Sequence, residues 1–150
     1  MTQEQLNEQQ EQSQMSLNSA ESREKKSKAQ FKELLRSQQG ELNAVLMYQR
    51  LAKAVKTDKE RETFLLLSKE EGRHASVFHA YTKQALKPKK TMAVVMPFLY
   101  CLMGKKRIYK LIAKGEYDAA VGYEHLIADF PEVESVKNDE KRHGDMFRLY

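Results

Sequence analysis

The sequence predicts an all-α protein: an antiparallel four-helix bundle with a long connection between its second and third helices and a pseudo-two-fold internal repeat. The 150 residues include only 6 Gly and 3 Pro, which are too few turn-forming residues for a β-sandwich or β-barrel. Hydrophobic residues make up 41% of the chain, too large a share for a wholly disordered protein. Beyond residue 30, apolar residues recur three and four positions apart, which is the period of an amphipathic helix.

The N-terminal segment has a different composition from the rest of the chain. Residues 1–28 are mainly Gln, Glu, Ser and Asn, and they can bury too little apolar surface to offset the entropy lost on ordering. We therefore expect a disordered tail, followed by one bundle domain over residues 29–150.

The boundaries of the bundle helices follow from capping and breaking signals. Thr57 and Glu60 form a T-x-x-E capping box, which begins a second helix after the first. Apolar periodicity in this second helix continues to Leu86, and Pro88 stops it. A break at residues 129–131 separates the last two helices. The expected helices span residues 29–56, 57–86, 105–128 and 131–150.

The connection between the second and third helices is basic and partly apolar. Residues 87–115 contain eight Lys or Arg and no acid, around an apolar run at residues 92–103 that Pro97 interrupts. This run is shorter than the roughly 18 residues needed to span a bilayer. We expect a crossover helix that covers one end of the core, with an interfacial membrane contact as the alternative. The net charge of +5 favours acidic partners or anionic surfaces without by itself indicating nucleic acid.

Each predicted bundle helix carries a glutamate in the middle of its apolar stripe. Four unpaired buried carboxylates would cost more than the roughly 5–15 kcal/mol that stabilises a domain. These stripes contain no Lys or Arg but do contain two histidines, each three residues after a glutamate and thus on the same helix face. Glutamate and histidine are ligands for iron, manganese or zinc. The candidate metal ligands are Glu41, Glu71, His74, Glu116, Glu140 and His143.

The same residues recur in an internal repeat. Glu41–Val55 aligns with Glu116–Phe130, and Glu70–Tyr81 aligns with Asp139–Tyr150. A duplicated helix pair of this kind predicts a pseudo-two-fold axis with two metal ions related by it. Asn43 is likewise equivalent to Asp118, so either could orient a ligand histidine, although we expect solvated positions for both.

The doubled pattern E-x6-Y, E-x-x-H resembles that of the rubrerythrin family in the ferritin-like superfamily. The Lys-rich crossover leading into LIAKGEYDAAVGYEHL is similar to the ferritin-like module joined to vacuolar-iron-transporter-type membrane domains. The resemblance implies that the six candidate residues hold two iron ions, with manganese or zinc as alternatives. It also implies that Tyr48 and Tyr123 hydrogen-bond to ligand carboxylates.

Two departures from the family pattern affect the expected activity. The single cysteine leaves no rubredoxin-type centre in the chain, so electrons must come from an external donor. Ala119 and Ala120 stand where many rubrerythrins have a further acidic ligand, which disfavours ligand exchange and fast peroxidase turnover. We expect that cysteine, Cys101, to be a buried inert thiol.

The resemblance implies a non-haem di-iron protein that reduces hydrogen peroxide or O2 while it oxidises Fe(II), in oxidative stress or iron homeostasis. One alternative is a module that senses, buffers or delivers iron to a membrane transporter. The other is a quinone-type di-iron hydroxylase, which an apolar channel to the metals would favour. The basic segment 87–115 suits an anionic membrane or a membrane transporter domain. No secretory signal is recognisable, so we expect a cytoplasmic or membrane-associated protein. We also expect a homodimer, and we expect no binding to nucleic acid.

Overall fold

The computed structural model describes the backbone of residues 3–149 and the side chains of residues 14–149. The chain divides into two compact units, residues 1–33 and 34–150. Every regular element among the described residues is helical, which confirms the all-α class. The elements are α1 (Gln3–Ala54), α2 (Asp58–Thr82), α3 (Thr91–Met103), α4 (Lys105–Tyr123), the 3-10 turn η1 (Glu124–Leu126) and α5 (Val133–Arg148).

The first unit is helical from Gln3, where the sequence led us to expect a disordered tail. Residues 1–2 of that predicted tail lie outside the described residues. The segment is rich in Gln, Glu and Lys, which lose little side-chain freedom in a helix. Pairs four residues apart add to this preference, including Lys28 Nζ with Glu24 Oε1 at 2.5 Å. Local propensity therefore accounts for a helix whose apolar side chains Met15 and Leu17 remain exposed.

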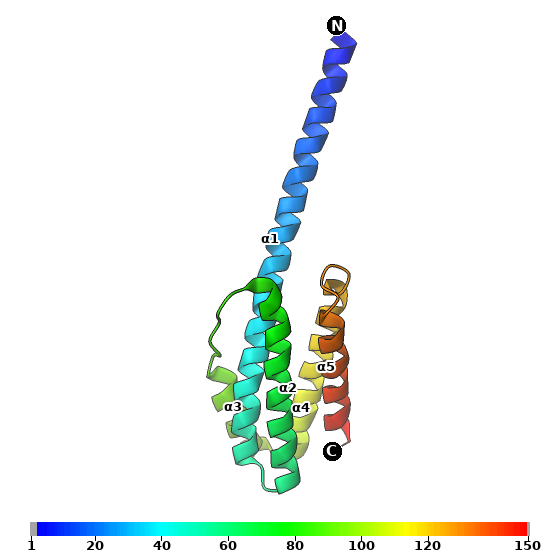
Figure 1. Ribbon diagram of the computed structural model, residues 1–150. Coiled ribbons are helices and arrows are strands. Elements are labelled where there is room, and N and C mark those ends of the chain that lie inside the picture. Colours follow the sequence, from blue (N-terminus) through cyan, green and yellow to red (C-terminus); the bar gives the residue numbers. More distant parts are fainter. Residues whose placement is uncertain (1–2, 150) are drawn as a thin grey trace. The chain divides into compact units, whose positions relative to one another are not determined.

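The second unit is a helical bundle built from two helix pairs (Figure 1). The bundle part of α1 packs on α2, where Ser68 Oγ donates to the carbonyl of Val45 at 3.1 Å. The helices α4 and α5 approach closely, because Gly144 of α5 faces the ring of Tyr117 and has no room for a Cβ atom. One apolar core cluster surrounds Tyr48 and the other includes Tyr123. This arrangement agrees with the predicted ferritin-like bundle. The middle of the bundle lies between these two apolar clusters.

The second helix begins as predicted and ends earlier than predicted. The Oγ1 atom of Thr57 accepts a hydrogen bond from the backbone N–H of Glu60 at 3.3 Å, as a helix N-cap does. At its other end α2 stops at Thr82, because Lys83 adopts a left-handed conformation with φ 55°. The prediction of a helix continuing to Leu86 is therefore wrong.

Side chains of α1 hold the connection between α2 and α3. The side-chain amides of Gln38 and Gln39 donate to the carbonyls of Gln84 and Lys87, both at 2.9 Å. Asn43 Oδ1 accepts from the backbone N–H of Lys89 at 2.7 Å. These tertiary hydrogen bonds satisfy backbone groups of a connection that has no regular structure of its own over residues 83–89.

The predicted crossover helix is α3, which packs on α4. It buries Ala93, Met96 and Tyr100, positions that share one helix face. Cys101 lies on the exposed face instead, so the expectation of a buried thiol is wrong. Within the described residues, no helix combines the length and apolar character needed to cross a membrane.

Candidate metal centre

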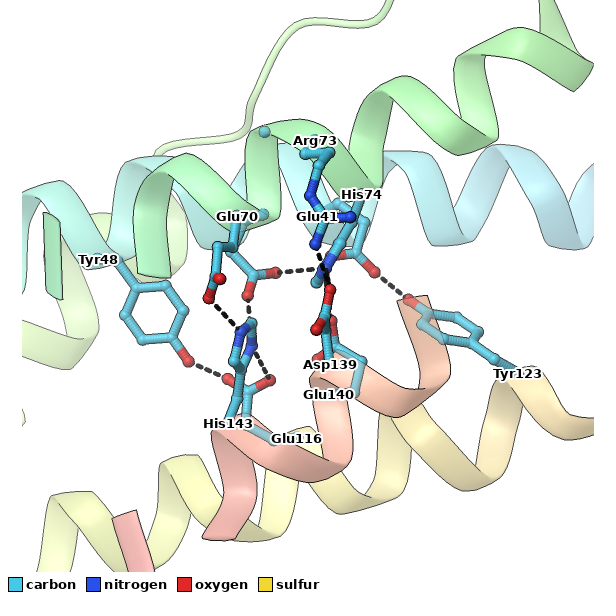
Figure 2. A network of polar contacts seen from close by, with 12 residues as sticks. Glu41, Tyr48, Glu70, Arg73, His74, Glu116, Tyr123, Asp139, Glu140 and His143 are labelled. Atoms are coloured by element: carbon cyan, nitrogen blue, oxygen red, sulfur yellow. Dashed lines mark hydrogen bonds and ion pairs between the residues drawn. The ribbon is translucent and has the colours of Figure 1, made fainter. Parts of the chain in front are cut away.

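The six predicted ligands come together in the interior of the bundle (Figure 2). Glu41 lies on α1, Glu71 and His74 on α2, Glu116 on α4, and Glu140 and His143 on α5. They form two groups, each with one histidine and three glutamates, and the ligand atoms of each group lie within 4.8 Å of one another. Glu71 and Glu140 belong to both groups, so two adjacent sites would share these two carboxylates.

Each histidine directs its Nδ1 atom at carboxylates from the other helix pair. His74 Nδ1 lies 2.8 Å from Glu140 Oε1, and His143 Nδ1 lies 3.1 Å from Glu71 Oε1. The two imidazole rings stack with their centroids 5.6 Å apart. This reciprocal exchange between α2 and α5 is the pseudo-two-fold relation that the sequence repeat predicts.

The outward nitrogen of each ring contacts an acidic residue that the sequence analysis missed. His74 Nε2 lies 3.1 Å from Asp139 Oδ2, and His143 Nε2 lies 2.8 Å from Glu70 Oε2. Such a contact fixes the orientation of the ring and leaves Nδ1 available to the interior. Glu70 and Asp139 directly precede the ligands Glu71 and Glu140, and they occupy equivalent positions in the internal repeat. That equivalence was the signal in the sequence that could have identified them.

Two arginines neutralise these outer acids. Arg73 pairs with Asp139, and Arg142 Nη2 lies 2.9 Å from Glu70 Oε1 and 3.0 Å from Asp139 Oδ1. Asn43 and Asp118 do not take the role considered for them. Asn43 holds the connection before α3, as described above, and Asp118 pairs with Lys114 on the exposed face of α4.

The two tyrosines also connect the helix pairs. The Tyr48 hydroxyl donates to Glu116 Oε1, and the Tyr123 hydroxyl donates to Glu41 Oε1. Burial, followed by the neighbouring carboxylate, raises the pKa of each phenol well above its ordinary value. Both tyrosines therefore stay protonated and act as hydrogen-bond donors to Glu116 and Glu41 at neutral pH.

Without a cation, protons balance the charge of this interior. Burial raises the pKa of the Glu41 and Glu140 carboxyls, since a buried carboxylate is poorly solvated. Burial lowers the pKa of the His74 and His143 imidazoles, but the surrounding carboxylates outweigh it and raise their pKa values to about 12 and about 9. A metal ion must displace these protons to bind.

The residues present fit a pair of divalent cations. The buried atoms Glu71 Oε1, His74 Nδ1, Glu140 Oε1 and His143 Nδ1 make no regular hydrogen bond and contact one another in two pairs, at 2.8 Å for His74 with Glu140 and 3.1 Å for His143 with Glu71. Protons hold these pairs together in the metal-free chain, and the same four atoms become metal ligands when cations replace the protons. Carboxylate oxygen and imidazole nitrogen are suitable ligands for iron, manganese and zinc.

The sequence model of the rubrerythrin family matches residues 32–150, which include all six of these residues. The chain belongs to the rubrerythrin family. Comparisons with curated proteins and with solved structures found no match. Membership of the rubrerythrin family and the buried carboxylate and histidine cluster agree with a metal-binding bundle of the di-iron type.

This rubrerythrin-family bundle also has an apolar cavity beside the cluster. The cavity has a volume of about 380 Å³ and reaches four of the candidate ligands, Glu41, Glu71, Glu116 and Glu140. The apolar part of its walls comes from α1, α3 and α4. Ala119 lines it, at a position where the resemblance would place a further acid in many rubrerythrins. The larger apolar lining residues are Met47, Met92, Met96, Leu111 and Ile112.

Proposed function

We propose that the chain is a rubrerythrin-like non-haem di-iron protein that reduces hydrogen peroxide or O2 while it oxidises Fe(II). The observation that carries this proposal is the pair of overlapping ligand groups, each with one imidazole and three carboxylates. Glu71 and Glu140 would bridge the two ions because they belong to both groups. Glu41 and Glu116 would be terminal carboxylates, and His74 and His143 would each serve one ion.

Two ferrous ions would supply Lewis acidity and two electrons, so that hydrogen peroxide and two protons give two waters and two ferric ions. The protein would hold its ligands in place for this reaction. Asp139 and Glu70 fix the histidine rings, and Tyr48 and Tyr123 hold the terminal carboxylates. An external donor would return the electrons for each further turnover.

Peroxide consumption by the Fe(II)-loaded chain with an added reductant tests this function. We expect many turnovers for the wild type. Glu71→Gln should consume peroxide more slowly by a factor that exceeds roughly 10–100, which is the loss expected when only a residue that hydrogen-bonds to a metal ligand is removed. Glu62→Gln is the matched control, because Glu62 is an exposed glutamate on the same helix.

The alternative functions predict different results. Reversible Fe(II) binding without multiple turnover would overturn the peroxidase or oxidase proposal in favour of iron sensing, buffering or delivery. Unchanged activity of Glu71→Gln would overturn the assignment of the metal site itself.

The apolar cavity favours a second candidate, hydroxylation of a quinone-type substrate. Its volume lies within the roughly 300–1,000 Å³ range of small-molecule sites, and its walls would exclude water around an apolar ring. In this reaction O2, two protons and two electrons from an external reductase would convert a ring C–H group to C–OH and release water. The four carboxylates at the inner end would then lie next to the carbon that reacts.

Filling the cavity separates the two candidates. A Cβ at Gly115, which lines the cavity, would meet nothing within 4 Å, so Gly115→Leu should fold and obstruct it. We expect this variant to consume peroxide normally but to hydroxylate a prenylated hydroquinone at least roughly tenfold more slowly. Gly122→Leu on the same helix is the control, because Gly122 also has free space and is not part of the cavity lining. Absence of ring hydroxylation of the prenylated hydroquinone by the wild type would exclude this second candidate.

A further inference from the structure

The outward face of α3 is apolar where the outer face of a bundle helix is normally polar. Val94, Phe98 and Leu102 lie four residues apart on one side of this helix and are 66%, 65% and 71% exposed. The opposite side is already used, since Ala93, Met96 and Tyr100 are buried against the bundle. The exposed side chains are thus a second apolar stripe that the core does not need.

Basic residues surround this stripe. Lys87, Lys89 and Lys90 are exposed directly before α3, and Lys106 and Arg107 are exposed directly after it. Arg50 and Lys53 of α1 line the same surface hollow as Val94 and Pro97 of α3. Residues 87–115 contain no acidic side chain that would offset this charge.

We propose that the outer face of α3, together with its basic rim, docks this protein on the surface of an anionic lipid membrane. An apolar stripe flanked by Lys and Arg lies in the plane of the interface, with the apolar side chains among the acyl chains and the cations at the headgroups. At 13 residues α3 is too short to span the bilayer, so the contact is interfacial. Each Lys or Arg held near an anionic surface strengthens binding roughly fivefold.

The helix α3 that carries the docking face also forms part of the wall of the apolar cavity. Met92 of α3 and Leu111 of α4 line the cavity and are also 43% and 48% exposed. Membrane docking would therefore bring the cavity to the acyl region, from which an apolar molecule could enter without crossing water. The docking inference itself stands on the surface of α3 and does not rest on the proposed function.

A single introduced tryptophan can report the contact, because the natural chain contains no Trp. The full chain with Phe98→Trp should show a blue shift with vesicles of phosphatidylcholine and phosphatidylserine, and brominated lipid should quench it. Leu65→Trp is the matched control, since Leu65 is 50% exposed on α2 and should show neither change. No shift for Phe98→Trp, or equal shifts for both variants, would overturn the proposal.

Vesicle sedimentation with tryptophan-free variants tests the two components of the contact. We expect Phe98→Ser with Leu102→Ser to weaken binding at least roughly tenfold, whereas Leu65→Ser with Leu66→Ser should bind like the wild type. Lys89→Gln with Lys90→Gln should also weaken binding, and added salt should weaken binding of the wild type. Circular dichroism checks that each variant is folded.

Two further outcomes would contradict membrane docking. If Phe98→Ser with Leu102→Ser bound vesicles as strongly as the wild type, the contact would be electrostatic adsorption without insertion of the apolar stripe. A concentration-dependent dimer that the same double variant makes monomeric, without vesicle binding, would mean that a second copy of the chain covers this face. Neither outcome bears on peroxide consumption, so the docking inference and the proposed function can fail separately.

Discussion

Two buried carboxylate sites in the same bundle are neutralised in different ways. Glu60 and Glu71 lie on the same helix and are 5% and 2% exposed, so burial alone does not distinguish them. Glu60 has a cation and two hydroxyl donors from the chain itself. Lys105 Nζ lies 2.7 Å from Glu60 Oε1. The Tyr109 hydroxyl donates to Glu60 Oε1 at 2.8 Å, and the Thr57 hydroxyl donates to Glu60 Oε2 at 2.7 Å. Glu71, in contrast, faces other carboxylates and the two histidines.

The pKa values of Glu60 and Glu71 are both low, but for different reasons. At Glu71, burial raises the pKa, but hydrogen bonds with His143, His74 and Glu41 outweigh it and bring the pKa to about 2. At Glu60, burial raises the pKa, but Lys105, Thr57 and Tyr109 outweigh it and bring the pKa to about 2. At the central cluster, burial raises the pKa of Glu41 and Glu140 so that they keep protons. A carboxylate that has its own Lys is complete without a ligand, whereas the central cluster is balanced by protons that metal ions would displace.

The largest expected effect comes from adding and removing metal. Anaerobic Fe(II) should raise the melting temperature of the wild type. An ion that is present at a free concentration of 100 times its dissociation constant adds about 2.7 kcal/mol to the free energy of unfolding. Glu71→Gln should lose most of this increase, whereas Glu60→Gln should keep it although its starting stability is lower. Calorimetry with and without Fe(II) measures both. If Glu60→Gln also lost the increase, the two sites would not be independent.

The next effect concerns Glu60 and pH. Because its folded-state pKa is about 2 and its ordinary value is 4.5, Glu60 stabilises the fold above pH 4.5 and loses this contribution as the pH falls toward 2. The contribution is at most about 3 kcal/mol. Glu60→Gln should lower the free energy of unfolding at pH 7 and flatten its dependence between these pH values. Urea titrations of the metal-free chain at several pH values measure how the free energy of unfolding changes with pH. The same pH dependence for Glu60→Gln and the wild type would contradict the ion pair between Glu60 and Lys105.

A smaller effect is expected at the acids that orient the histidines. Asp139→Asn removes the charge beside His74 Nε2 and should weaken metal binding by roughly 10–100-fold. Asp118→Asn, at an exposed pair with Lys114, is the control and should change little. Metal titration against a competing chelator measures both variants. Equal affinities for Asp139→Asn and the wild type would show that the ring needs no such partner.

The smallest effect compares one tyrosine from each site. Tyr109→Phe at Glu60 and Tyr48→Phe at Glu116 each remove one hydrogen bond, which is worth about 1 kcal/mol to the free energy of unfolding. Only Tyr48→Phe should alter metal affinity, because Tyr109 lies at the site that has its own cation. A change in metal affinity with Tyr109→Phe would remove the distinction between the sites.

Helical periodicity and the repeat were enough to predict the bundle and the residues of the central cluster. Residues three and four apart share a helix face, so Glu71 and His74 had to lie together, and Glu140 and His143 likewise. The buried charge of four glutamates without Lys or Arg then required a partner. These inferences depend on local geometry and on charge, and both can be read along the chain.

Only the tertiary structure decided which segments meet. The capping box identified Glu60 as a helix-start residue, but its partner Lys105 comes from α4, far along the sequence. The exchange by which Asp139 holds His74 and Glu70 holds His143 also depends on how α2 and α5 face each other. The same holds for the apolar cavity, whose apolar lining comes from three helices. Periodicity specifies the face of one helix, whereas contacts between helices depend on their relative rotation and spacing, which packing determines.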